Sequence, residues 1–258
     1  MMVTPIPAFE DNYIWCLSDA DSGYAVVVDP GDDDPVRDHL REKDLKLAAI
    51  LVTHKHGDHT GGIRGLLADW PGIPVYGPQN EPIRTLTRRV AEGDRIEIPE
   101  IAATFEVLDV PGHTEGHVAY LDGDRLFCGD TLFAAGCGRV FSGTHEQLYA
   151  SLSKIAALPP QTRLYCAHEY TLANLGFAEW VEPESTAIRL RVERDSATRR
   201  RKEPTVPSLL ADELETNPFL RSHVPQVIEA AERHAGRPLA EGVETFTAIR
   251  SWKDRDYD

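Results

Sequence analysis

The residues best suited to chemistry lie in one short segment that follows an apolar run. The segment Thr53-His54-Lys55-His56-Gly57-Asp58-His59 brings three imidazoles and one carboxylate close together in the chain. Imidazole and carboxylate groups are common ligands of zinc, iron and manganese in proteins. Burying several such groups together costs free energy, because they lose their contacts with water. A bound cation would offset this cost. The segment therefore predicts a metal site.

Three more ligand-type residues follow apolar runs elsewhere in the chain. His113 follows Pro111-Gly112, Asp130 follows Cys128-Gly129, and His168 follows Cys166-Ala167. Any one of them, taken alone, is more often a cap or a hydrogen-bonded core residue than a ligand. Ligand sites of α/β proteins gather at the carboxyl ends of strands, so the metal-binding segment strengthens the prediction for all three.

Short apolar runs bounded by Gly, Pro or Asp occupy the first two thirds of the chain and predict strands. They lie at 13–17, 24–29, 47–53, 75–77, 105–110, 117–121, 125–128 and 164–167. Helices are predicted over 36–43, after Asp34-Pro35, and over 144–158. The turn Asp122-Gly123-Asp124 predicts a hairpin, so the domain is α/β with some antiparallel sheet.

Beyond about Tyr170 the strand patterns stop and helical patterns take over. Helices are expected over 172–181, 183–202, 208–215, 224–234 and 245–253. We place a domain boundary near residue 173. Residues 1–173 are then expected to form the α/β domain, and residues 174–258 a small all-helical domain.

Composition excludes several classes of protein. The 258 residues are 41% hydrophobic and 27% charged, as in ordinary globular proteins, and the net charge of −15 disfavours nucleic-acid binding. No apolar run approaches the roughly 20 residues of a membrane-spanning helix, and the N-terminus lacks a signal-peptide pattern. Four cysteines without a CxxC pair indicate a reducing compartment. We expect a cytoplasmic monomer without nucleic-acid or membrane partners.

The ligand-type residues resemble those of the metallo-β-lactamase superfamily. Other segments are similar to the glyoxalase II, or hydroxyacylglutathione hydrolase, family within it. These are 5–13, 129–133, 136–139, 167–171, 217–219 and the Arg250…Lys253-Asp254 tail. The resemblance implies a metallo-β-lactamase-like αββα sandwich followed by a small all-helical C-terminal domain that binds glutathione.

The same resemblance implies two divalent metal ions, with zinc expected and iron or manganese as alternatives. One ion would be held by His54, His56 and His113, and the other by Asp58, His59 and His168, with Asp130 bridging them. A metal-bound hydroxide would hydrolyse S-D-lactoylglutathione to glutathione and D-lactate in methylglyoxal detoxification. Asp58 and Asp130 would be the catalytic carboxylates.

The resemblance further implies a substrate site for the glutathione carboxylate. Its basic and tyrosine residues map onto Arg139, Tyr170, Arg250 and Lys253. Some family members have a second tyrosine where this chain has Phe141, which removes one hydroxyl group. Cys137, between two glycines, is interpreted as a packed thiol rather than a nucleophile.

Three alternatives remain at this stage. A related hydrolase would act on a lactone, a β-lactam or RNA, but RNA would require a positive channel. A mononuclear iron dioxygenase acting on glutathione persulfide would consume oxygen. A noncatalytic glutathione- or metal-binding module would not require an open water position on the metal.

Overall fold

The computed structural model describes residues 1–257, which form two compact units. The first unit comprises residues 1–109 and 114–129, and the second comprises residues 110–113 and 130–257. The chain therefore enters the second unit briefly at 110–113 before it returns. The boundary near residue 173, which was drawn from helix content, stays a prediction.

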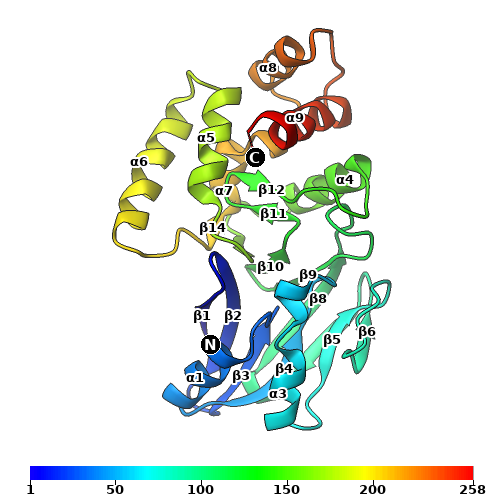
Figure 1. Cartoon of the computed structure of the whole chain (residues 1–258), viewed down its shortest axis with the longest axis vertical. Helices are drawn as coiled ribbons and strands as arrows, with labels where there is room; N and C mark the ends of the chain where they lie inside the picture. Colours follow the sequence, from blue (N-terminus) through cyan, green and yellow to red (C-terminus); the bar gives the residue numbers. More distant parts are fainter. Residues whose placement is uncertain (258) are drawn as a thin grey trace. The chain divides into compact units, whose positions relative to one another are not determined.

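A six-stranded sheet in the first unit contains the earliest strands in sequence order (Figure 1). The first three strands are antiparallel, and each later strand is parallel to its neighbour. The strands are β1 (Met2–Ala8), β2 (Asn12–Asp19), β3 (Tyr24–Val28), β4 (Lys46–Leu51), β5 (Val75–Pro78) and β6 (Arg88–Val90). Parallel pairs require crossover connections, which here include α1 (Asp34–Glu42) and α3 (Ile63–Asp69).

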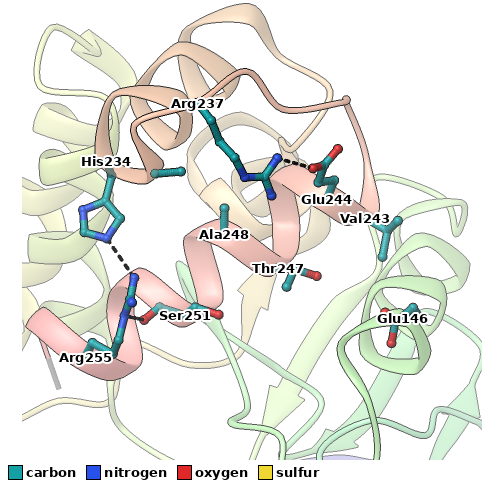
Figure 2. Close-up of a pocket in the computed structure, with 10 residues that line it drawn as sticks. Glu146, His234, Arg237, Val243, Glu244, Thr247, Ala248, Ser251 and Arg255 are labelled. Atoms are coloured by element: carbon teal, nitrogen blue, oxygen red, sulfur yellow. Dashed lines mark hydrogen bonds and ion pairs between the residues drawn. The ribbon is translucent and has the colours of Figure 1, made fainter.

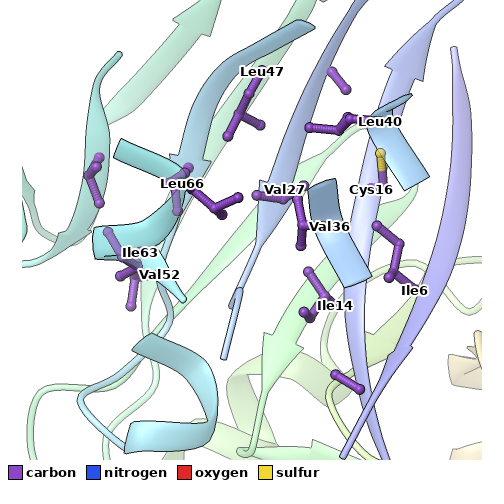
Figure 3. Close-up of a cluster of buried hydrophobic side chains, with 14 of the residues drawn as sticks. Ile6, Ile14, Cys16, Val27, Val36, Leu40, Leu47, Val52, Ile63 and Leu66 are labelled. Atoms are coloured by element: carbon purple, nitrogen blue, oxygen red, sulfur yellow. The ribbon is translucent and has the colours of Figure 1, made fainter. Parts of the chain in front are cut away.

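Apolar side chains of α1 and α3 cover one face of this sheet. Val36 and Leu40 of α1, with Ile63 and Leu66 of α3, pack in one buried cluster with side chains from the strands, among them Val27 (Figure 3). All residues from 25 to 28 are buried, as expected for a strand enclosed on both faces. This core fixes the carboxyl ends of β3 and β4. Asp29 follows β3, and the predicted metal-binding segment follows β4.

Four further strands of the first unit pair antiparallel. They are β7 (Arg95–Ile98), β8 (Ala103–Asp109), β9 (Val118–Asp122) and β10 (Arg125–Gly129), with the short helix η1 (Pro99–Ile101) after β7. The predicted hairpin is confirmed, because Asp122 pairs with Arg125 across a turn in which Gly123 adopts a φ of 61°. The hydroxyl of Tyr120 donates to the carbonyl oxygen of Val52 at 2.6 Å, which ties β9 to the segment after β4.

The second unit is mainly helical. Its helices are α4 (His145–Ala156), α5 (Thr171–Val181), α6 (Thr186–Arg200), α7 (Leu210–Thr216), η2 (Pro218–Leu220), α8 (Pro225–Ala235) and α9 (Val243–Asp256). Its short strands are β11 (Leu132–Phe133), β12 (Gly136–Cys137), β13 (Arg163–Cys166) and β14 (Ser208–Leu209). Thr144 and Gln147 form a capping box that starts α4.

The β11–β12 hairpin, directly after Asp130, is held by side chains from distant segments. Asn174 and Asn217 donate to the carbonyl oxygens of Ala134 and Gly136, Glu213 accepts from the N–H of Ala135, and Arg250 donates to the carbonyl oxygen of Cys137. Buried backbone groups require partners, and here the later helices supply them. The helical segments therefore determine the course of this hairpin.

Most of the predicted elements are present with shifted ends, but some elements were not predicted. Pro5 and Pro7 argue against a strand, yet β1 forms because it lies at the edge of its sheet, where the missing N–H groups are tolerated. The short elements α3, β6 and β7 lack strong start signals. Among residues 1–257, no helix combines the length and the apolar character that crossing a bilayer would need.

Candidate metal centre

Four of the predicted ligands lie together in the first unit, around the short helix α2 (Gly57–Thr60). The Nε2 atom of His54 lies 3.0 Å from the Nδ1 atom of His56. Two nitrogens that bind one tetrahedral zinc ion at about 2.0–2.1 Å are separated by about 3.3 Å. The spacing of these two imidazoles therefore fits ligands that share a cation.

The buried carboxylate of Asp29 sets the orientation of two of these histidines. Its oxygens accept from the N–H and hydroxyl of Thr53, both at 2.7 Å, and Oδ2 lies 3.1 Å from Nδ1 of His59. Because the Thr53 hydroxyl donates to Asp29, it accepts from Nδ1 of His54 at 3.0 Å. Both histidines thus keep Nε2 as the ligand atom, because the group bound to Nδ1 of a metal-binding histidine fixes its tautomer and its orientation.

Asp58 also has a positioning partner. The amide of Asn12 donates to Oδ2 of Asp58 at 3.0 Å, and the same oxygen lies 3.3 Å from Nε2 of His59. Neither Asn12 nor Asp29 was predicted from the sequence as a positioning residue. One sequence feature could have indicated them, because each is a polar residue at the end of an apolar strand. Asn12 is the first residue of β2, and Asp29 directly follows β3.

Glu81 connects the ligand segment to the residues before β9. This buried carboxylate accepts from the N–H of Gly116 at 3.1 Å and lies 3.5 Å from Nζ of Lys55. The buried ring of His117 stacks on His54 with centroids 4.7 Å apart. The ligand segment is therefore also supported by residues that follow it in the chain, whereas Asp29 precedes it.

The other three predicted ligands lie together in the second unit. Oδ2 of Asp130 is 3.4 Å from Nε2 of His113, and Oδ1 of Asp130 is 3.4 Å from Nε2 of His168. The two oxygens of one carboxylate therefore face two different imidazoles. A carboxylate that bridges two cations needs this arrangement.

The seven side chains make up two His/Asp groups that are consistent with a dinuclear metal site. The first group is His54, His56, His113 and Asp130, and the second is Asp58, His59 and His168. Nitrogen and carboxylate donors of this kind suit zinc, iron and manganese alike.

Two of the predicted substrate residues are accessible in the second unit. The side chain of Arg139 is 51% exposed, and Tyr170 is partly exposed with its ring stacked 4.8 Å from that of His168. Phe141 is 66% exposed and lies edge-on to His113, with ring centroids 5.2 Å apart. Polar and aromatic side chains therefore border the ligands of this unit.

The other two predicted substrate residues are buried. Arg250 is 0% exposed, and its Nη1 donates to the carbonyl oxygen of Cys137 while its guanidinium lies 5.1 Å from the ring centre of Phe219. Lys253 is 6% exposed, and its Nζ donates to Oδ1 of Asn174 at 3.0 Å. Both cations are therefore buried against the β11–β12 hairpin and its neighbours, and their role in binding the substrate stays a prediction.

The thiol of Cys137 is also buried. Burial raises its pKa to about 11, although the charge of Arg250 partly opposes this shift. The thiol is therefore neutral near pH 7, whereas a cysteine nucleophile needs its thiolate form.

A cavity of about 530 Å³ lies along α8 and α9, on a different part of the second unit (Figure 2). Its lining includes Arg237, Glu244 and Arg255. Arg237 and Glu244 form an ion pair at 2.6 Å, which cancels charge inside the cavity. The predicted glutathione contacts do not line it, so it offers no support for the glutathione site.

Comparison with known proteins assigns the chain to a family. Residues 13–168 match the model of the metallo-β-lactamase superfamily, and residues 169–256 match that of the hydroxyacylglutathione hydrolase C-terminus. The hydroxyacylglutathione hydrolase of Alkalilimnicola ehrlichii is 54% identical over 253 residues, covering 98% of each chain. That of Nitrosomonas europaea is 49% identical over 255 residues, covering 98% of this chain and 95% of the relative. The chain belongs to the hydroxyacylglutathione hydrolase family.

A solved structure agrees with the fold of this family. The crystal structure of ETHE1 from Myxococcus xanthus matches with a TM-score of 0.68 and 26% identity, covering 97% of this chain and 90% of the other. The predicted fold class is confirmed as a metallo-β-lactamase α/β sandwich with the helical C-terminal domain of hydroxyacylglutathione hydrolases.

Proposed function

We propose that this protein hydrolyses S-(2-hydroxyacyl)glutathione thioesters, with S-D-lactoylglutathione as the principal substrate, in methylglyoxal detoxification. The products are glutathione and a 2-hydroxy acid, D-lactate in this case. The observation that carries the proposal is the pair of His/Asp groups in a chain about half identical to hydroxyacylglutathione hydrolases over its length. A noncatalytic binding module would have no need for two such groups.

The donor set fits two divalent ions, for which we propose zinc with iron or manganese as alternatives. When bound, such ions lower the pKa of a water molecule and polarise a carbonyl oxygen. The protein's own contribution is to present ligand atoms in fixed positions. Asp29 does so for His54 and His59, and Asn12 does so for Asp58. We assign Asp58 and Asp130 as the catalytic carboxylates, with Asp130 as the bridge.

Substrate binding is proposed to depend on the cations of the second unit. The exposed guanidinium of Arg139 is suited to direct contact with the glycyl carboxylate of glutathione, and Tyr170 to a hydrogen bond. Arg250 and Lys253 are proposed as substrate-binding residues too, since their positive charges lie beside the hairpin that leads to Arg139. A thiolate leaving group is easier to expel than an amine. Because the metal ions would supply an activated water as nucleophile, the protein needs no side-chain nucleophile.

We further propose that the protein acts as a monomer in the cytoplasm. One chain supplies all the residues of both ligand groups. Its four cysteines are free thiols, as expected in a reducing compartment.

The test is thiol release from S-D-lactoylglutathione, measured beside the metal content of the same preparation. We expect turnover that rises with metal occupancy and is lost in Asp130→Ala. A fully metal-loaded protein that does not hydrolyse the thioester would refute the proposal. Oxygen consumption with glutathione persulfide would instead favour the dioxygenase.

A further inference from the structure

Asp254, near the end of α9, lies between two arginines. Its Oδ1 atom is 2.9 Å from Nη2 of Arg250 and 3.6 Å from Nε of Arg139. The three side chains differ in accessibility, at 0% for Arg250, 32% for Asp254 and 51% for Arg139. The carboxylate therefore connects a buried cation to an exposed one.

Arg250 provides a fixed anchor for this carboxylate. Besides Asp254, it contacts the carbonyl oxygen of Cys137 and the face of Phe219. A buried guanidinium with contacts on several sides has little freedom to change rotamer. Asp254 lies one helical turn later on the same face of α9, and its hydrogen bond with Arg250 therefore fixes the position of its carboxylate.

The contact with Arg139 restrains one edge of its guanidinium. Arginine carries five N–H donors in a planar fork, and it binds a carboxylate most strongly through two parallel hydrogen bonds. A carboxylate held on the Nε edge orients the fork that Nη1 and Nη2 form. Restraining a long exposed side chain before a ligand arrives also reduces the entropy lost on binding.

Asp254 does not cancel the attraction for an anion. Arg139, Arg250 and Lys253 together carry three positive charges against its single negative charge. Arg250 and Lys253 are buried near the hairpin that leads to Arg139, so their charges add to the attraction of Arg139 for an anion.

We infer that Asp254 is a positioning residue that holds the guanidinium of Arg139 in the orientation that binds the substrate carboxylate. This inference rests on the proposed function, because it assigns Arg139 to the glutathione carboxylate. Asp254 itself does not contact the substrate in this scheme. Its effect passes through Arg139 and should therefore appear in binding.

The test is Asp254→Asn in the full-length, metal-loaded enzyme. Asparagine keeps the size and can still accept a hydrogen bond from Arg250, but it removes the charge that attracts Arg139. The KM for S-D-lactoylglutathione should rise roughly three- to tenfold, because one long side chain is no longer pre-ordered. The kcat should stay within about twofold, and the circular dichroism spectrum should not change.

Three controls separate positioning from a general structural role. Asp256→Asn, on the same helix but paired with His234 at 3.4 Å, should leave KM unchanged. S-lactoyl-N-acetylcysteamine, a thioester without carboxylates, should be hydrolysed equally by parent and Asp254→Asn. In an Arg139→Lys background, which lacks the Nε edge, adding Asp254→Asn should have no further effect on KM.

Binding of S-methylglutathione, measured by calorimetry, keeps the test independent of turnover. Asp254→Asn should weaken it by the same factor as KM. If the parent binds this probe but hydrolyses no thioester, the proposed function fails while the positioning role is still measured. If the parent does not bind it, or if Asp254→Asn folds and binds it as well as the parent, the inference is wrong.

Two other results would overturn the inference, since each indicates a structural role. One is a fall in kcat equal to the loss of kcat/KM, and the other is an equal loss of activity toward both thioesters. Should Asp254→Asn fail to fold, Arg139→Lys alone decides the matter. Lysine keeps the charge at an exposed position but cannot be held by its Nε edge. An unchanged KM in that variant would contradict the inference.

Discussion

The Nδ1 atom of His113 lies 2.8 Å from the backbone carbonyl oxygen of Arg139. A carbonyl oxygen can only accept, so His113 carries its proton on Nδ1 and keeps Nε2 as the metal-ligand atom. The side chain of the same arginine is the exposed cation next to Asp254. Residue 139 therefore orients a metal ligand with its backbone and presents an anion-binding group with its side chain.

Gly138, just before Arg139, has no room for a side chain. A Cβ atom there would lie 2.0 Å from the backbone oxygen of Asp130 and 2.9 Å from Nδ1 of His113. We expect Gly138→Ala to displace both ligands, with reduced metal content and a turnover lower by at least roughly tenfold. Metal analysis and thioester assays check this. Gly57→Ala, where nothing lies within 4 Å of the added Cβ, is the matched control and should retain its metal.

Asp29 should strengthen metal binding, although it lies far in sequence from the ligands that it orients. Asp29→Asn removes the negative acceptor shared by His59 and Thr53, so we expect metal affinity to fall roughly 10–100-fold. Competition with a chelator of known affinity measures the change. Asp38→Asn, on the exposed face of α1, removes the same charge and should have no effect. Equal affinities for Asp29→Asn and the parent would exclude the orienting role.

Asp130→Ala tests the proposed bridge between the two metal ions. Loss of a carboxylate that faces both His113 and His168 should lower turnover by at least roughly a hundredfold and reduce metal content. Turnover and metal content are measured on one preparation whose unfolding temperature is checked. A variant that keeps two metal ions and near-normal turnover would rule out the bridging role.

Cys137→Ala should leave turnover within a few fold. The thiol is buried, and burial raises its pKa to about 11, so it supplies almost no thiolate near neutral pH. Steady-state kinetics checks the prediction. Mass-spectrometric detection of an acyl group on Cys137 during turnover would contradict it.

The stability of the fold should decrease at high pH because of its buried thiols. Burial raises the pKa of Cys16 from 9.0 to about 12. Because the pKa is higher in the folded state, the contribution of the neutral Cys16 thiol to the free energy of unfolding is fully present below pH 9. It is lost as the pH rises toward 12. Between roughly pH 9.5 and 11, the free energy of unfolding should fall more steeply with pH in the parent than in Cys16→Ala. The two slopes should differ by about 1.4 kcal/mol per pH unit. Urea unfolding at several pH values measures it, and identical slopes would contradict the assignment.

Features that depend on neighbouring residues could be predicted from the sequence. The clustered histidines and Asp58 predicted a metal site, because few other roles explain so many ligand-type groups in one segment. The Asp122-Gly123-Asp124 turn predicted its hairpin, and apolar periodicity predicted most strands and the helical C-terminal region. These patterns are local, since a turn or a strand face is set by residues within a few positions of one another.

The groups that position the ligands, and the accessibility of the cations, depend on long-range packing that the sequence pattern does not reveal. Asp29 contacts His59 across 30 positions of sequence, and Asn12 contacts Asp58 across 46. Arg250 and Arg139 have the same charge, yet the packing of α9 buries the first and leaves the second exposed. The sequence pattern cannot separate them, because burial and hydrogen-bond partners depend on which distant segments pack together.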